Sequence, residues 1–343
     1  MWFGTRSLDD DSDLVGATLA HSEQLAPRRR LRKGHVLTAD DLDAMREAGL
    51  AKVTVAIPEP CDMMEDAAAA HIADVFALEG FRREDVGTGR VNFHALADGV
   101  LVLAPERIDS LNRIDPAITL ATLPNFSHVR AGQMIATVKI IPFAVAATLV
   151  EKAAAEVGKP DTIRVHGFRN GLRVAIIQTE VKGTKASVLD KTVRVTVARL
   201  EKTHAQLVGE TRTAHDAGEL SAEIEMQLAG ADMVLVFGAS AVTDSRDVIP
   251  QAIVQAGGTI LRVGMPVDPG NLLVLGEIAS KPVIGAPGCA RSPKENGFDW
   301  VLWRLCAGLK VTGDNIISMG VGGLLTEIPL RPHPRETANP GDN

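Results

Sequence analysis

Small, hydroxyl-bearing and acidic residues gather directly after a strongly apolar run in the C-terminal half of the chain. Residues 234–237 of that run contain no polar side chain, which is typical of a strand buried on both faces of a parallel sheet. Gly238, Ala239 and Ser240 follow, and their small size would let a ligand approach the backbone. Pro250 suits the first turn of a helix, where its missing N–H costs nothing.

The order of strand, open loop and helix N-terminus is typical of an anion site. In open α/β sheets, ligands bind beyond the carboxyl ends of the strands, and a helix N-terminus offers unpaired N–H groups to a phosphate. We therefore expect residues 238–246 to bind a phosphate-bearing ligand, with Ser245 and Arg246 as further donors. An ordinary strand-to-helix connection in the core is the alternative, because so short a motif has little specificity.

Two acids precede predicted helices on this side of the chain. Asp247 lies three residues before Pro250, and Asp216 lies directly before a helix predicted at residues 217–228. We expect the Asp247 carboxylate to project into a crevice, because an unpaired charge in the core would cost several kcal/mol. Two acids facing a phosphate make chemical sense chiefly with Mg²⁺ between them. Helix capping is the alternative role for Asp247.

A second loop rich in glycine and proline, residues 285–294, precedes a helix predicted at 298–307. It supplies Gly288, Ser292 and Lys294, and Asn296 follows it, so these four residues are further candidates for ligand contact. A cap for the following helix is the alternative role of this segment. Thr179 follows a strand predicted at residues 173–178 and is expected at the same sheet edge.

The alternation of strands and helices predicts the fold class. Strands are expected at 173–178, 206–210, 234–237, 260–263, 271–275 and 281–284, and helices at 191–204, 217–228, 250–255 and 298–307. This order predicts an α/β fold with three layers and a doubly wound, mostly parallel sheet over residues 161–330. Residues 331–343, with proline and charge but little apolar content, are expected to be a disordered tail.

A smaller, mixed α+β region is expected at residues 1–160, with subregions 1–57 and 58–160 and a linker at residues 158–160. Its predicted strands are short and their connections irregular, so we expect no second Rossmann-like domain there. In the first subregion Thr38 is expected to cap a helix by accepting the N–H of Asp41. In the second, residues 85–90 are expected to form a turn, and residues 143–155 a helix rich in alanine.

Composition excludes several classes of protein. The 343-residue chain has a formal net charge of -7, no Tyr and 3% aromatic residues, so it lacks the basic footprint and stacking platforms of nucleic-acid binding. Three cysteines without a CxxC pair indicate neither a disulfide framework nor a structural zinc site, and favour a cytoplasmic location. No run of about 18 apolar residues occurs, so no membrane segment is expected.

Arg246, Asp247 and Pro250, preceded by Gly238, resemble the molybdopterin-binding domain shared by molybdopterin adenylyltransferases and molybdopterin molybdotransferases. In that family an Arg-Asp pair precedes a proline at a helix start, and the Asp is functional, which implies a catalytic and metal-binding role for Asp247. Two other segments, residues 214–216 and 285–288, are similar to the family's acidic turn and its Leu-Pro-Gly loop. The first of these implies the same catalytic and metal-binding role for Asp216.

The resemblance covers residues 170–310 and extends more weakly to residues 32–38, which look like the segment that precedes the binding domain of the molybdotransferases. The chain is most similar to the module that some bacteria join to a molybdenum-cofactor nucleotidyltransferase. Where the molybdotransferases carry a Lys-Pro-Gly-Lys-Pro loop, residues 268–272 keep the turn through Pro269 and Gly270 and lose both lysines. This departure leaves binding of a phosphorylated pterin better supported than insertion of molybdate.

The resemblance implies molybdopterin as ligand or substrate, Mg²⁺ as its metal, and ATP or molybdate as co-substrate of a transferase. It also implies a homo-oligomer and contact with a cofactor nucleotidyltransferase. Two alternatives remain open. One is a carrier or sensor that binds the cofactor without turnover. The other is an unrelated α/β protein that binds a phosphosugar or nucleotide and shares only the geometry of the sheet edge.

Overall fold

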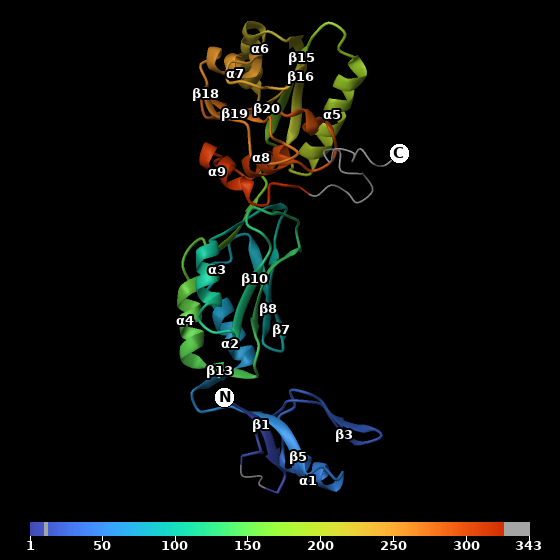
Figure 1. The fold of residues 1–343 in the computed structure, drawn as a ribbon, viewed down its shortest axis with the longest axis vertical. Helices are drawn as coiled ribbons and strands as arrows, with labels where there is room; N and C mark the ends of the chain where they lie inside the picture. The colour runs from blue at the N-terminus through green and yellow to red at the C-terminus, as the bar shows by residue number, and fades with distance from the viewer. Residues whose placement is uncertain (10–12, 326–343) are drawn as a thin grey trace, which may run out of the picture. The chain divides into compact units, whose positions relative to one another are not determined.

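The computed structural model describes residues 1–9 and 13–325, and the prediction of a disordered tail at 331–343 lies outside the described residues. The chain divides into two compact units, Met1–His166 and Gly167–Asn343 (Figure 1). No helix within the described ranges is both long and apolar enough to cross a membrane.

The first unit begins with a three-stranded antiparallel sheet. Its order is β1 (Trp2–Ser7), β5 (Lys52–Ile57) and β2 (Thr18–Leu19), and a hairpin of β3 (Glu23–Ala26) and β4 (Arg29–Leu31) is inserted before α1 (Ala39–Glu47). Helix α1 begins as predicted, because the Thr38 hydroxyl accepts the N–H of Asp41 and the Asp41 carboxylate accepts the N–H of Thr38. This reciprocal pair fixes the start of the helix.

The rest of the first unit is also mixed α+β, as predicted. A four-stranded antiparallel sheet has the order β10 (Ile118–Thr122), β12 (Met134–Ile140), β8 (Arg90–Ala95) and β7 (Phe81–Gly87). Smaller sheets pair β11 (His128–Val129) and β14 (Ile163–Gly167) with β9 (Gly99–Leu103), and β13 (Ala144–Ala146) with β6 (Asp62–Met64). The helices are α2 (Glu65–Asp74), α3 (Pro105–Asn112) and α4 (Ala147–Val157).

Two expectations for this unit had the wrong bounds. The turn expected at residues 85–90 is confined to residues 88–89, because β7 extends to Gly87 and pairs with β8, with one register shift between Asp85 and Gly87. The sequence of β7 is mostly charged, so it lacks the alternation of apolar residues that predicts a strand. The alanine-rich helix begins at Ala147 rather than at residue 143, because residues 144–146 pair with β6 as β13.

The second unit contains a six-stranded sheet. Its order is β16 (Gln206–Ala214), β15 (Arg173–Glu180), β17 (Met233–Phe237), β20 (Lys281–Ala286), β19 (Val274–Ile278) and β18 (Thr259–Val263). The first four strands are parallel, and β19 and β18 are antiparallel to their neighbours. This arrangement confirms the predicted doubly wound, mostly parallel sheet.

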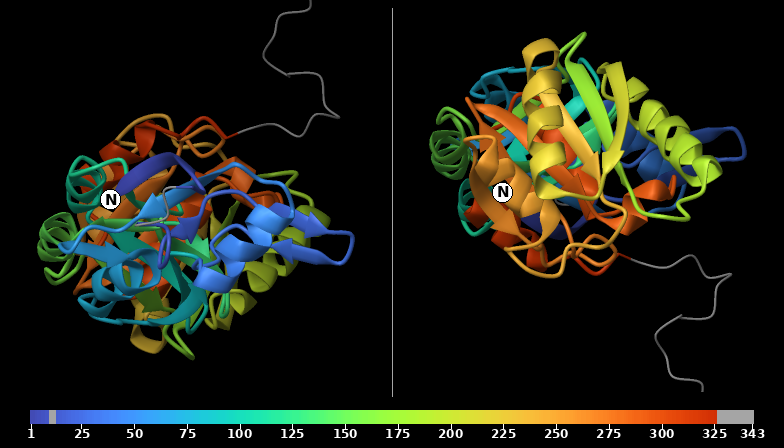
Figure 2. Two further views of the ribbon diagram at one scale, coloured as in Figure 1. Left: turned by 90° about the horizontal axis from the view of Figure 1, so that it is seen from below. Right: turned by 90° about the horizontal axis from the view of Figure 1, so that it is seen from above.

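Helices cover both faces of this sheet (Figure 1 and Figure 2). Helices α6 (Ala217–Gly230) and α7 (Val248–Gln255) pack on one face, where Val234 and Val236 of β17 join their buried residues. Helices α5 (Ala186–Glu201) and α8 (Gly297–Cys306) lie on the other face, where Phe237 packs against Phe298 with ring centroids 6.4 Å apart. The short helix α9 (Gly313–Ile317) and the 3₁₀ turns η1 (Gly288–Arg291) and η2 (Ser318–Gly320) complete this unit. The result is the three-layer arrangement expected from the sequence.

Some predicted bounds in this unit differ from the structure. Helix α5 begins at Ala186, five residues before the predicted start, because no side chain at its N-cap marks the beginning. The strand predicted at 271–275 is β19, which begins only at Val274, because residues 269–272 form a turn and the N–H of Leu273 donates to the carbonyl of Gly270. Both differences arise from backbone features that have no local sequence signal.

Candidate functional site

The strand order places a topological switch point between β15 and β17. The chain leaves β15 for β16 on one side and returns to β17 on the other side, and Gln178 of β15 pairs in register with Phe237 of β17. Connections that diverge in this way leave a crevice at the carboxyl ends of the two strands, where ligands of open α/β sheets bind. Thr179 and Gly238, two of the predicted site residues, lie at this edge.

Thr179 joins the ends of three strands. Its side chain is fully buried, and its hydroxyl accepts the N–H of Ala239, after β17, at 2.8 Å. The same oxygen lies 2.8 Å from Nδ1 of His215, which follows β16. A neutral His215 that accepts on Nδ1 receives the hydroxyl proton of Thr179, so one hydroxyl satisfies both partners. Thr179 therefore holds the loop after β17 in place.

The loop of residues 238–247 approaches its own backbone closely. A Cβ atom added at Gly238 would lie 2.7 Å from the carbonyl oxygen of Ser240 and 3.1 Å from Cδ1 of Ile249, so glycine is required there. Ser240, Ala241 and Ser245 are exposed, and their N–H groups donate to no atom of the described residues. The loop therefore presents donors to solvent, as an anion site needs.

The two predicted acids are both helix caps. Asp247 Oδ1 accepts the N–H of Val248 at 2.7 Å, and Oδ2 accepts the N–H of Thr243 at 3.1 Å. Asp216 Oδ1 accepts two N–H groups in the first turn of α6, at 2.9 and 3.1 Å. The alternative role considered for Asp247 is therefore present in the structure. Across the part of the chain that is described, no three His, Cys, Asp or Glu side chains form a group that could hold a metal ion.

Arg246 is turned to solvent. Its side chain is 85% exposed, and its Nε lies 2.8 Å from Oδ1 of Asp244, which also accepts the Arg246 N–H. Hydrogen bonds from Arg246 hold the pKa of the Asp244 carboxyl below its usual value. The charge of Arg246 is therefore already matched by a neighbouring acid on the same loop.

Arg199 of α5 holds the second predicted loop, residues 285–294, in place from the interior of the protein. This buried guanidinium pairs with Asp299 of α8, with 2.6 Å between Nε and Oδ1. It also donates to the backbone carbonyls of Ala290, Ser292 and Lys294 at 2.8, 2.5 and 3.1 Å. Ser292 and Lys294 thus contribute carbonyls to the interior, while their side chains stay nearer the surface.

Asn296 and the turn at Pro269 meet at the start of α8. Asn296 is buried, and its side-chain oxygen accepts the N–H of Phe298 at 3.1 Å, so it is the helix N-cap. The carbonyl of Pro269 accepts the N–H of Gly297 at 2.9 Å. Gly270 has a φ of 145°, and a Cβ there would lie 2.8 Å from the Gly297 nitrogen. These predicted residues support the loop through the backbone, and Gly288, at its start, is exposed.

Sequence reasoning passed over Arg291, which lies in the same loop. Its Nη1 donates to Oε1 of Gln178 at 3.3 Å and to the hydroxyl of Thr192 at 2.5 Å, and its Nη2 donates to the carbonyl of Gly238 at 3.1 Å. The guanidinium also lies over the ring of Phe237, 5.3 Å from its centroid. Arg291 is half-buried, and burial lowers its pKa. Its position was not predicted, because the type of residue does not reveal its burial or its partners.

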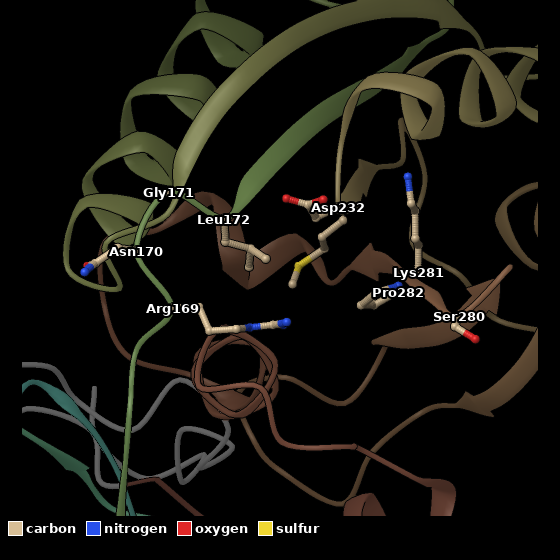
Figure 3. Close-up of a pocket in the computed structure, with 9 residues that line it drawn as sticks. Arg169, Asn170, Gly171, Leu172, Asp232, Ser280, Lys281 and Pro282 are labelled. Atoms are coloured by element: carbon tan, nitrogen blue, oxygen red, sulfur yellow. The ribbon is translucent and has the colours of Figure 1, made fainter. Parts of the chain in front are cut away.

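A cavity of about 400 Å³ lies at the opposite, amino edge of the sheet (Figure 3). Arg169 extends across it in Figure 3, and Lys281 points away from it. Lys281 donates to the carbonyls of Leu228 and Ala231 at the end of α6, and Arg169 donates to the carbonyl of Leu305 in α8. None of the site residues predicted from the sequence lines this cavity. Its cations bind helix C-termini, whose partial charge is negative and opposes an anion.

Comparison with known proteins gives limited matches. A family described as a domain of unknown function (DUF8806) matches residues 12–57. No curated protein matches the chain. Among solved structures, the molybdopterin biosynthesis moea protein from Pyrococcus horikosii is similar, with 14% identity, 72% of this chain and 79% of that chain covered, and a TM-score of 0.31.

Two further solved structures are similar at the same level. A molybdenum cofactor biosynthesis protein from Pyrococcus furiosus has 13% identity, covers 72% of this chain and 71% of its own length, and has a TM-score of 0.26. The protein CinA with unknown function from Thermoplasma acidophilum has 16% identity, with 37% of this chain and 92% of that chain covered, and a TM-score of 0.27. Because these TM-scores are low, we assign the fold from the order of strands in the sheet and describe the candidate site from the contacts of its own residues.

Proposed function

We propose that this protein binds a phosphorylated small molecule at the switch point between β15 and β17, and that the ligand is molybdopterin. The observation that carries the proposal is the exposed loop after β17, where the N–H groups of Ser240, Ala241 and Ser245 have no partner among the described residues. This loop lies beside a half-buried cation, Arg291, which contacts the carbonyl of Gly238. The resemblance of Gly238 and residues 246–250 to molybdopterin-binding domains supplies the identity of the ligand.

The remaining predicted residues have two kinds of role in this proposal. Ser240 and Ser245 contact the phosphate, chiefly through backbone N–H groups. Gly238 and Ala239, whose N–H donates to Thr179, leave room for it, and Gly288, Ser292 and Lys294 face the rest of the ligand from the second loop. The other residues, Thr179, Pro269, Gly270 and Asn296, act through the backbone segments that they hold. Arg246 contributes little, because its charge is matched by Asp244 and is surrounded by solvent.

The acids at this edge favour binding over metal-assisted transfer. Mg²⁺ requires near-octahedral coordination by oxygen, and it is usually held by carboxylates together with substrate phosphates. Both oxygens of Asp247 and one oxygen of Asp216 accept backbone N–H groups, and the described residues add no third acid to them. These residues do not form a metal site by themselves. The activity that we propose is therefore binding of the cofactor, without transfer of a nucleotidyl group or molybdate.

Binding of molybdopterin to the full chain, measured by calorimetry, tests this proposal. Wild-type protein should bind about one equivalent. Gly238→Ala should weaken binding about tenfold or more, because the added methyl group displaces Ser240 and the loop; a tenfold change corresponds to about 1.4 kcal/mol. Gly230→Ala at the end of α6 is the matched control, since its added Cβ meets only Arg173, at 3.6 Å. Absence of binding, or equal binding by the Gly238→Ala variant, would refute the proposal.

A further inference from the structure

Two arginines on the α5 and α8 face of the sheet differ in how their charge is balanced. Arg199 is buried and has Asp299 as its counter-ion at 2.6 Å. Arg291 contacts Gln178, Thr192 and the carbonyl of Gly238, all of which are neutral. Within the described ranges no carboxylate lies within 4.0 Å of Arg291, the limit for a salt bridge. One guanidinium therefore has its charge matched inside the protein, and the other does not.

Neutral acceptors satisfy hydrogen bonds without cancelling charge. Removing a cation from water is costly unless an opposite charge or strong dipoles replace the water. Arg291 is half-buried and stays protonated at physiological pH, although burial lowers its pKa. The electrostatic cost at Arg291 would be offset by an anion placed next to it.

Arg291 also has donors that no acceptor occupies. A guanidinium has five N–H groups. In the structure the two on Nη1 donate to Gln178 and Thr192, and one on Nη2 donates to Gly238. The Nε–H and the second Nη2–H have no acceptor in the described part of the chain. An anion can therefore accept from Arg291 without displacing Gln178, Thr192 or the carbonyl of Gly238, and its hydrogen bonds would be charge-assisted.

We propose that Arg291 is the counter-charge for a phosphate group of the ligand at the switch point, so that the phosphate is bound without a metal ion. This inference rests on the proposed function and deepens it, because it names a dianionic phosphate monoester as the ligand class. Arg291 reaches the site from the loop after β20, and the exposed N–H groups of Ser240 and Ala241 reach it from the loop after β17. The guanidinium supplies the charge, and the backbone supplies further hydrogen bonds.

The experiment uses inorganic phosphate as the probe and the full chain with EDTA present. Phosphate should raise the Tm of wild-type protein above its value in chloride at equal ionic strength. In Arg291→Gln the calorimetric affinity for phosphate should fall about tenfold or more, because the charge-assisted pair is lost. Arg246→Gln is the matched control and should bind phosphate like wild type, since Arg246 is exposed and paired with Asp244.

Arg291→Lys keeps the charge and loses the fork, so it should bind phosphate between wild type and Arg291→Gln, and it replaces the glutamine variant if that fails to fold. Equal affinity in wild type and Arg291→Lys and Arg291→Gln, or no phosphate binding by wild type in EDTA, would overturn the inference. Equal molybdopterin affinity in wild type and the Arg291 variants would also refute the inference, while leaving the proposed function intact. Phosphate binding that depends on Arg291, without molybdopterin binding, would instead refute the proposed ligand.

Discussion

The two edges of the six-stranded sheet use their cations differently. At the amino edge, Lys281 and Arg169 donate to carbonyls at the ends of helices, next to a cavity of about 400 Å³. At the carboxyl edge, Arg291 donates to neutral oxygens, lies over the ring of Phe237, and keeps two N–H groups without an acceptor among the described residues. The two edges therefore differ in what their cations contact: at the amino edge the contacts are carbonyls of helix C-termini, which carry negative partial charge, and at the carboxyl edge they are not. This difference is the reason that we propose an anion at the carboxyl edge.

The difference follows from the direction of the helices. In an alternating α/β fold the helices that follow parallel strands begin at the carboxyl edge and end at the amino edge, so N–H groups collect at one edge and carbonyls at the other. At the amino edge, Lys281 and Arg169 donate hydrogen bonds to these carbonyls. At the carboxyl edge, Asp216 and Asp247 accept N–H groups at the starts of helices. In the proposed site the ligand accepts from the N–H groups that remain without an acceptor.

The largest effect is expected from removing the counter-ion of Arg199. Asp299→Ala leaves a buried guanidinium without its carboxylate and should lower the free energy of unfolding by about 3–5 kcal/mol. Denaturant titration followed by circular dichroism measures this change. Asp190→Ala, which removes a more exposed partner of Arg212, is the control and should cost at most about 1 kcal/mol. If the free energy of unfolding of Asp299→Ala fell by less than about 1 kcal/mol, the carboxylate would not matter to Arg199, and the difference that we draw between Arg199 and Arg291 would have no energetic basis.

An intermediate effect is expected at Thr179. Thr179→Val keeps the shape and removes the hydroxyl that accepts the Ala239 N–H and contacts His215, so the free energy of unfolding should fall by about 1–3 kcal/mol. Molybdopterin binding should weaken as well, because the loop after β17 loses its anchor. Thr179→Ser restores the hydroxyl and should behave nearly like wild type. Identical phosphate and molybdopterin affinities in both variants would show that Thr179 does not position the loop.

A smaller effect is expected at the amino edge. Lys281→Met removes the two hydrogen bonds to the end of α6 and should cost about 0.3–1 kcal/mol of stability. Ligand affinity should not change, because Lys281 does not belong to the carboxyl-edge site. Calorimetry with molybdopterin, beside thermal denaturation, separates the two quantities. A tenfold loss of affinity in this variant would move the ligand site to the amino edge.

The smallest effect is expected from Asp247→Asn. Asparagine keeps one oxygen to cap the helix and loses the acceptor for the N–H of Thr243. Because Thr243 is exposed, water can replace that acceptor, so the Tm should be nearly unchanged. Affinity for molybdopterin should also be similar to wild type with or without Mg²⁺, because the carboxylate acts as a cap. A tenfold loss of affinity that appears only with Mg²⁺ present would show instead that Asp247 holds a metal, as the family resemblance implies.

Features encoded by neighbouring residues could be predicted from the sequence. The uninterrupted apolar run of β17 indicated a parallel strand, and Thr38 and Asp247 stand where helix caps belong. Features encoded by distant residues could not. Arg199 and Asp299 are 100 residues apart, and their pairing depends on the packing of two helices. The lack of a carboxylate beside Arg291 is likewise a property of the folded chain, so this residue was missed.

Amide hydrogen exchange with and without ligand tests the central claim most directly, because it observes both edges of the sheet in one experiment. We expect saturating molybdopterin to slow exchange at Ser240, Ala241 and Ser245, whose N–H groups are exposed in the structure, and to leave residues 169–172 unchanged. Slower exchange at residues 169–172, with no change at Ser240, Ala241 and Ser245, would contradict the account and place the ligand in the amino-edge cavity.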